Sequence, residues 1–213
     1  TNPLTVSAIW DAEYSNNYTD YTNVIVNGVV VGLHDKGYIL QDIQSGEMIS
    51  VHDNSNIPVI GDEITISGQF NVSFDIARIL NVSQYQVLSQ DNSLNLDLSG
   101  AVEIDFANFD VANYQGKLVK VTGPWVKLYS GATSYARLAL DEAGTADKVY
   151  DGAYIGLQNG ANDLNLSNPL SSVFTALDTA TEYANVTIYI FFYDSTSSYE
   201  KAVIVNDAFI VTE

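Results

Sequence analysis

Two copies of one strand pattern occur along this chain, and that repeat restricts the fold more than any other feature. Residues 24–28 (VIVNG) match residues 119–123 (VKVTG), which lie 95 positions later (123 − 28). Residues 77–81 (ARILN) match residues 202–206 (AVIVN), which lie 125 positions later (206 − 81). Such self-similarity is typical of a structural unit repeated along a chain. We therefore expect two copies of one unit, and the growing offset places a longer middle in the second copy, between about residues 141 and 183.

Almost every segment of the first copy alternates with a period of two residues, which predicts β-strands. The strand-like segments, separated by turn residues, are residues 23–32, 37–42, 47–51, 61–70 and 75–88. Five short antiparallel strands can close into a small barrel, which removes unpaired sheet edges. A glycine in each first strand, Gly28 and Gly123, predicts a β-bulge that lets the strand curl around the barrel.

Helical signals are confined to two places. Residues 168–177 (NPLSSVFTAL) predict a short helix in the longer middle of the second copy, because Asn caps a helix and Pro suits its first position. Val6, Ile9 and Trp10 predict a lead-in helix within residues 1–20. The predicted fold class is all-β, with two small five-stranded OB-like Greek-key barrels in tandem and a short helix in the second. The predicted domains are residues 1–94 and 95–213.

The order of these segments resembles an OB-fold barrel. Residues 37–42 (GYILQD) are similar to the second strand of that family, and residues 61–68 (GDEITISG) are similar to its fourth strand. Residues 104–123 resemble the linker and first strand of a second such barrel. Tandem barrels of this kind occur in predicted surface lipoproteins of Gram-negative gut bacteria, and the resemblance covers about residues 20–213. It implies a fold and no particular activity.

The resemblance also implies an exported protein, at the outer cell surface or in the periplasm of a Gram-negative bacterium. The chain begins Thr1-Asn2-Pro3-Leu4, without a start Met or a charged targeting segment, and its acidic, Tyr-rich and Asn-rich composition suits export. We expect a lipid anchor upstream of these residues and no transmembrane segment, because no apolar run approaches the ~20 residues of a membrane span. Cysteine is absent, which excludes disulfides, thiolate metal sites and a Cys nucleophile.

The charge balance argues against nucleic acid as a partner. The chain has 8 Lys and Arg against 26 Asp and Glu, a net charge of −18, whereas a protein that grips a phosphate backbone needs clustered cations. The local exception is the second copy, where Lys117, Lys120, Lys127 and Arg137 gather near aromatic residues. This cluster keeps single-stranded nucleic acid as an alternative partner. The other interpretation of these cations is a solvated outer face of the strands.

The OB-like resemblance implies a ligand face across the second and third strands and the neighbouring loops. In the first copy this face would carry Tyr38 and His52 as ligand-binding residues. The alternative for Tyr38 is a strand aromatic that is partly buried, and the alternative for His52 is a solvated or hydrogen-bonded imidazole.

The second copy offers Trp125, Tyr129, Tyr135 and Arg137 around a predicted hairpin at residues 130–133. Aromatic faces beside polar side chains suit a neutral, polyhydroxylated ligand. The alternative is an aromatic cluster in the core or at a sheet edge.

Signatures of an enzyme are lacking, because the sequence contains no Gly-x-Ser-x-Gly elbow and no phosphate-binding loop. We expect no cofactor and no metal. Asp151 and Asp163 are the candidates for calcium, in an oxygen-rich loop that turn-forming Asn and Asp residues also explain. The sequence thus predicts a non-enzymatic binding module at the cell surface or secreted, with a glycan or protein as ligand. The alternatives are single-stranded nucleic-acid binding and a purely structural accessory domain.

Overall fold

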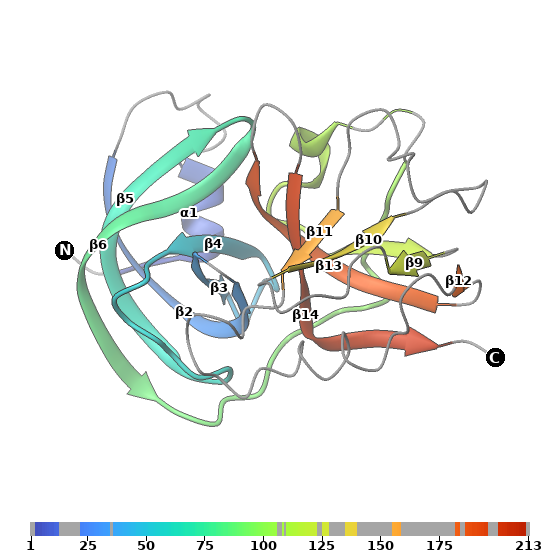
Figure 1. Cartoon of the computed structure of the whole chain (residues 1–213). Coiled ribbons are helices and arrows are strands. Elements are labelled where there is room, and N and C mark those ends of the chain that lie inside the picture. Colours follow the sequence, from blue (N-terminus) through green and yellow to red (C-terminus); the bar gives the residue numbers. More distant parts are fainter. Residues whose placement is uncertain are drawn as a thin grey trace.

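Two β-sheets make up most of the described chain, and Figure 1 shows them as two units side by side. The computed structural model describes residues 3–12, 22–34, 36–105, 108, 110–122, 125–127, 135–139, 155–158, 182–183, 186–195 and 200–211. The elements of the first unit are β1 (Leu4–Thr5), α1 (Val6–Ala12), β2 (Thr22–His34), β3 (Gly37–Gln41), β4 (Met48–His52), β5 (Glu63–Ser73) and β6 (Ile76–Ser89). The elements of the second unit are β7 (Val102–Glu103), the 3₁₀ helix η2 (Val111–Tyr114), β8 (Val119–Thr122), β9 (Trp125–Lys127), β10 (Tyr135–Ala139), β11 (Ile155–Gln158), β12 (Glu182–Tyr183), β13 (Val186–Ser195) and β14 (Glu200–Val211).

The first sheet closes into a five-stranded barrel in the order β2-β3-β4-β6-β5, because β5 pairs back onto β2. All neighbours around the barrel are antiparallel except β4 and β6, which run parallel with Ser50 opposite Arg78. This closed order is that of an OB-like Greek-key barrel. The predicted strands of the first copy are therefore present, and they pair as the resemblance implies.

The second sheet repeats the same pairings. β8 pairs with β13 as β2 pairs with β5, and β9 pairs with β10 as β2 pairs with β3. The parallel pair recurs between β11 and β14, with Leu157 opposite Ala202. β8 and β9 together therefore take the place of β2. This equivalence confirms the all-β, OB-like fold class that the internal repeat predicted.

The glycine of the first strand does not form the predicted bulge. Gly28 stays in register with β5, and the register shift in the pairing of β2 with β3 lies between Val30 and Gly32. A Cβ at Gly28 would lie 3.1 Å from the backbone oxygen of Gln41. The glycine therefore permits a close approach of β3, which is the other reason for a glycine inside a strand. Gly123 lies outside the described residues.

The predicted lead-in helix is α1, a helix of seven residues. The Thr5 hydroxyl accepts a hydrogen bond from the backbone N–H of Ala8 (3.1 Å), which supplies an N-terminal cap. Val6 and Ile9 are fully buried in the core of the first barrel. The Trp10 indole Nε1 donates to the carbonyl oxygen of Met48 (2.9 Å), so the helix is attached to the start of β4.

The two units share one hydrophobic cluster in addition to the core of the first barrel. Val31, Ile39 and Met48 belong to the first barrel but pack with Phe191 and Tyr193 of β13. These residues lie on the outer surface of the first barrel, while their neighbours in β3 and β4 belong to its interior cluster. The outside of the first barrel is therefore part of a core that both units build.

Several expectations concern residues beyond the described ones. Tyr129, the calcium candidates Asp151 and Asp163, and the helix predicted over residues 168–177 all lie outside the described residues. The domain division at residues 94 and 95 stays a prediction. None of the helices among the described residues is long and apolar enough to span a membrane.

Candidate functional site

The face that an OB-like barrel offers to ligands is covered in the first unit. All five residues of β3 are buried, and four of the five in β4 are buried. Tyr38 and Leu40 point into the first barrel core, whereas Ile39 and Met48 pack in the cluster shared with β13. A strand that is buried on both sides cannot present a ligand surface. In this structure the second unit packs on this face, and a ligand-binding role of the first-copy residues remains a prediction.

A buried ion-pair network fastens this contact. The Asp194 side chain of β13 is 3% exposed and accepts from Arg78 Nη1 of β6 (2.7 Å) and from Lys36 Nζ (2.5 Å). The Arg78 side chain is 14% exposed, so both partners of that pair are largely removed from water. A buried pair of this kind is poor evidence of stability, but the loss of one partner leaves an uncompensated charge. Asp194 therefore links β13 to Arg78 of β6 and to Lys36 across the contact between the units.

Both histidines of the chain lie beside this network. The ring of His34 stacks on Tyr193 with centroids 4.1 Å apart, and the ring of His52 lies 5.6 Å from that of His34. His52 Nε2 lies 3.0 Å from the carbonyl oxygen of Tyr193, to which it donates. Burial lowers the pKa of His52 from 6.5 to about 4, and the nearby Arg78 adds to the shift. His52 is therefore a hydrogen-bonded imidazole, which was one of the two interpretations of this residue. Its ligand-binding role remains a prediction.

Tyr38 lies entirely inside the first barrel, with no exposed surface. Its hydroxyl donates to Asp53 Oδ2 over 3.4 Å. Burial raises the pKa of the Tyr38 phenol, and the nearby negative charge of Asp53 raises it further. The alternative that Tyr38 is a strand aromatic agrees with this placement, and the burial leaves no surface on which a ligand could rest.

The structure places three of the second-copy candidates on strands of one sheet. Tyr135 and Arg137 of β10 lie opposite Gln158 and Gly156 of β11, and Trp125 of β9 lies opposite Tyr183 of β12. The ligand-binding role of these residues remains a prediction.

Two of the predicted cationic residues already have partners. Lys120 Nζ lies 2.9 Å from Glu103 Oε2, and the hydrogen bond to that carboxylate raises the pKa of Lys120. Lys117 Nζ donates to the carbonyl oxygen of Asn113 (2.9 Å). The Glu103 carboxylate offsets the charge of Lys120, whereas the hydrogen bond to Asn113 leaves the charge of Lys117 in place.

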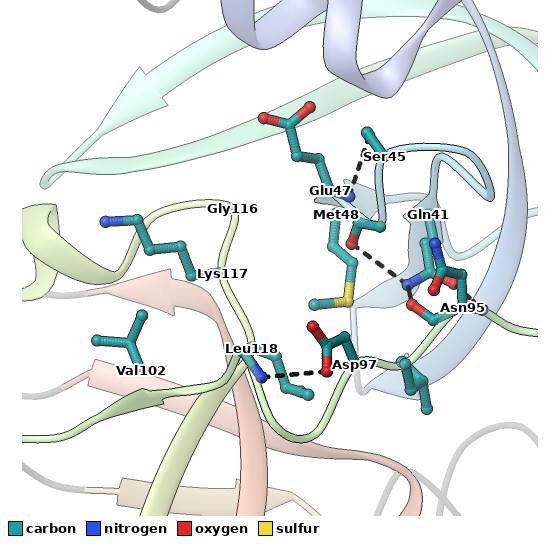
Figure 2. A pocket seen from close by; sticks show the side chains of 13 residues that line it. Gln41, Ser45, Glu47, Met48, Asn95, Asp97, Val102, Gly116, Lys117 and Leu118 are labelled. Atoms are coloured by element: carbon teal, nitrogen blue, oxygen red, sulfur yellow. Dashed lines mark hydrogen bonds between the residues drawn. The ribbon is translucent and has the colours of Figure 1, made fainter.

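A pocket of about 390 Å³ lies where the two units meet, next to the loop between β3 and β4. Its volume falls within the range of small-molecule sites. Three stretches of chain line it: the end of β3 through the start of β4, the connection between the units, and the segment that leads into β8. The lining residues are Gln41, Ser45, Gly46, Glu47, Met48, Asn95, Leu96, Asp97, Gly100, Val102, Gly116, Lys117 and Leu118. Figure 2 shows Met48 in the middle of the view, with Asp97 below it and Glu47 above.

Hydrogen bonds hold the walls of this pocket. The Gln41 side chain donates to the Asn95 carbonyl oxygen (2.6 Å) and accepts from its backbone N–H (2.9 Å). The Asn95 amide nitrogen donates to the carbonyl oxygen of Ile43 (2.8 Å). On the other wall, the Met48 N–H donates to the Gly116 carbonyl oxygen (3.3 Å). These hydrogen bonds join the segments that form the pocket walls.

The sequence did not predict this pocket. Most of its residues follow no motif, and Asn95 lies more than fifty positions from its partner Gln41. One signal was available: residues 37–41 (GYILQ) and 48–52 (MISVH) carry apolar side chains at both parities. Strands buried on both faces show that pattern, so the sequence could have indicated that this face is covered.

Metal ligands do not gather in the described part of the chain. No group of three or more His, Asp or Glu side chains that could hold a metal ion occurs among the described residues. His34 and His52 are near one another, but both make hydrogen bonds to backbone carbonyl oxygens.

Comparison with known proteins adds little to this description. No family model matches the chain, and no curated protein matches it. Among solved structures, the chain is similar to the hypothetical protein ygiW from E. coli, with 22% identity and a TM-score of 0.32. The match covers 41% of this chain and 91% of that chain. A structural similarity with so low a TM-score supports no conclusion about this chain. The OB-like assignment therefore rests on the strand order of the two sheets.

Proposed function

We propose that this protein is a non-enzymatic binding module that takes a glycan or a protein segment in the pocket between its two units. The observation that carries the proposal is the pocket itself, which combines a buried apolar floor with a polar rim. Specific ligand sites have this composition. The usual OB-like face of the first barrel is covered, so the pocket is the better candidate for contact with a ligand.

The Ser50–His34 pair, which lies among the described residues, does not supply a nucleophile and its base. Ser50 Oγ lies 3.2 Å from His34 Nε2, but both side chains are fully buried. The Lys36 backbone N–H donates to His34 Nδ1 (3.2 Å), so the proton of the neutral ring is on Nε2. A base must accept the nucleophile's proton at that nitrogen, and an occupied Nε2 cannot accept it. This supports binding over catalysis for the pair.

The charge of the protein supports a ligand other than nucleic acid. The net charge is −18, and the charge of Lys120 is offset by Glu103. Counterion release therefore offers little free energy for binding a phosphate chain.

One observation favours the alternative of a structural accessory domain. The β3–β4 face is covered, and this contact joins the two units.

We further propose that the protein works outside the cytoplasm, at the outer surface or in the periplasm of a Gram-negative cell. The acidic, cysteine-free composition and the resemblance to predicted surface lipoproteins support this location. Fractionation of cells, with detection of the native protein by antibody, would test it. Recovery of the protein in the cytoplasm would contradict it.

The binding proposal is tested with the full chain on a glycan array and on single-stranded oligonucleotides at two salt concentrations. Ser45 is exposed at the rim of the pocket, so S45F should fill its mouth and abolish glycan binding. Ser55 is equally exposed in another loop, so S55F serves as the matched control and should bind normally. Oligonucleotide retention that weakens steeply with salt would contradict the proposal. If S45F and S55F lose glycan binding equally, the binding site does not lie in the pocket.

A further inference from the structure

From the lining of this pocket we infer its ligand class: an uncharged sugar ring, with sugars that carry a carboxylate or phosphate excluded. The inference rests on the proposed binding function and adds to it the chemistry of the ligand. It follows from three features of the pocket: an apolar floor, a rim of oxygen acceptors, and a cation that is turned away.

The floor is apolar and largely buried. Met48 is 1% exposed and Leu118 is 8% exposed, and Leu96 and Val102 are partly buried beside them. A pyranose ring presents C–H groups on its faces, and such a face can rest on aliphatic side chains. Methionine suits this contact because its unbranched thioether adapts to irregular shapes. The pocket is large enough for one ring but not for a folded segment of protein.

The rim offers acceptors to the hydroxyl groups of a sugar. Asp97 Oδ1 accepts from the Ser99 hydroxyl (2.6 Å) and from the backbone N–H groups of Ser99 and Gly100. These bonds, the Ser99 hydroxyl first, lower the pKa of Asp97, so it is ionised near neutral pH. In Figure 2 the other carboxylate oxygen of Asp97 points toward Met48. Asn95 Oδ1 adds a further acceptor, since the Asn95 amide nitrogen is already bound to Ile43.

The charge of the rim is negative. The lining residues contain two carboxylates, Glu47 and Asp97, and one cation, Lys117. The Lys117 ammonium donates to the Asn113 carbonyl oxygen (2.9 Å), and in Figure 2 it is turned away from Asp97. An acidic sugar resting on the floor would therefore place its negative charge near the Asp97 carboxylate without a facing cation. Like charges brought together cost free energy, whereas a neutral ring meets no such penalty.

The experiment uses the full chain and three methyl glycosides that share one ring: methyl glucoside, methyl glucuronide and methyl glucosaminide. Binding is measured by isothermal calorimetry and by saturation-transfer NMR. We expect the neutral glucoside to bind, the glucuronide to bind at least about tenfold more weakly, and the glucosaminide to bind no more weakly than the glucoside.

Variants assign this selectivity to the pocket. D97N keeps an acceptor oxygen for Ser99 and Gly100 but removes the charge, so it should bring the glucuronide to within about threefold of the glucoside. E103Q removes the same charge at an exposed position outside the pocket and should leave the discrimination unchanged. Thermal unfolding of both variants checks that each is folded.

The outcomes separate this inference from the binding function. If the glucoside and the glucuronide bind equally, or if E103Q relaxes the discrimination as much as D97N does, the inferred ligand class is wrong while a binding function remains. If none of the three glycosides binds and the glycan array is also negative, the proposed glycan-binding function fails with it. Binding of the glucosaminide alone would also overturn the inference, because the pocket would then select a cation.

Discussion

Acidification should weaken the contact between the two units, because His52 is held there as a neutral imidazole. Burial lowers its pKa from 6.5 to about 4 in the folded protein, and Arg78 and Lys36 oppose the added charge while Asp194 favours it. Between these two pKa values the unfolded chain binds more protons than the folded chain, so the free energy of unfolding falls as the pH falls. Above the pKa that His52 has in the unfolded chain, this residue causes no loss of unfolding free energy. Below the pKa that His52 has in the folded protein, the loss is complete.

The size of the effect follows from the two pKa values. A difference between 6.5 and about 4 corresponds to at most about 3 kcal/mol, at ~1.36 kcal/mol per pKa unit. Partial exposure of His52 to solvent reduces this figure. The effect is nevertheless large compared with the ~5–15 kcal/mol that stabilises a typical domain.

The assay compares the wild-type chain with H52Q by urea unfolding, followed by circular dichroism, from about pH 7 to about pH 4. The Gln amide nitrogen can replace Nε2 as the donor to the Tyr193 carbonyl oxygen, but it does not titrate in this range. The many carboxylates titrate alike in both proteins, so the difference between the two pH profiles isolates His52. Wild type should lose about 2–3 kcal/mol relative to H52Q across this window. Parallel pH profiles would refute the reasoning.

Four further predictions concern stability. D194N should destabilise the chain by about 3–5 kcal/mol in urea unfolding, because it leaves Arg78 buried without its carboxylate, whereas E103Q, in an exposed pair, should have no measurable effect. G116A should cost about 2 kcal/mol or more, since φ is +69° and a Cβ would lie 2.8 Å from the Trp10 ring. G46A should cost about 1 kcal/mol, since φ is +80° but a Cβ would make only ordinary van der Waals contact with Asn95, at 3.5 Å. Equal losses would exclude the Trp10 contact. F74N should stabilise the turn by about 0.5–1 kcal/mol and so raise the melting temperature. The reason is that Phe74 (φ 49°) and Asp75 (φ 59°) both adopt the left-handed region, which Asn tolerates. The control F74A should give no gain. Residues 1–94 expressed alone should bind a hydrophobic dye and lack a cooperative melt, because Val31, Ile39, Met48 and Ile76 lose their cover; a cooperative melt without dye binding would show that the first unit folds by itself.

Local patterns in the sequence were sufficient for the strands and for the repeat. Alternation with period two depends only on neighbouring residues, and the strands predicted at 37–42, 47–51, 61–70 and 75–88 correspond to β3, β4, β5 and β6. The matched segments 24–28 and 119–123 begin equivalent ladders, with β5 and with β13. Closure of the first set follows because unpaired strand edges are costly.

The site could not be predicted in the same way. Tyr38 and His52 were predicted as ligand residues from their place in an OB-like barrel, but a barrel considered alone does not reveal what packs on its outside. The cover depends on Asp194 reaching Arg78, 116 positions away in the sequence.

The sequence by itself therefore determined the fold class, because alternation, turns and the repeat are local properties of the chain. Only the tertiary structure decided which barrel face is open, because that depends on how the two units pack. The packing covers β3 and β4 with β13, and it forms the pocket between residues 41–48 and 95–118. Burial and pocket shape arise from contacts between distant segments, and no single segment of the sequence encodes them.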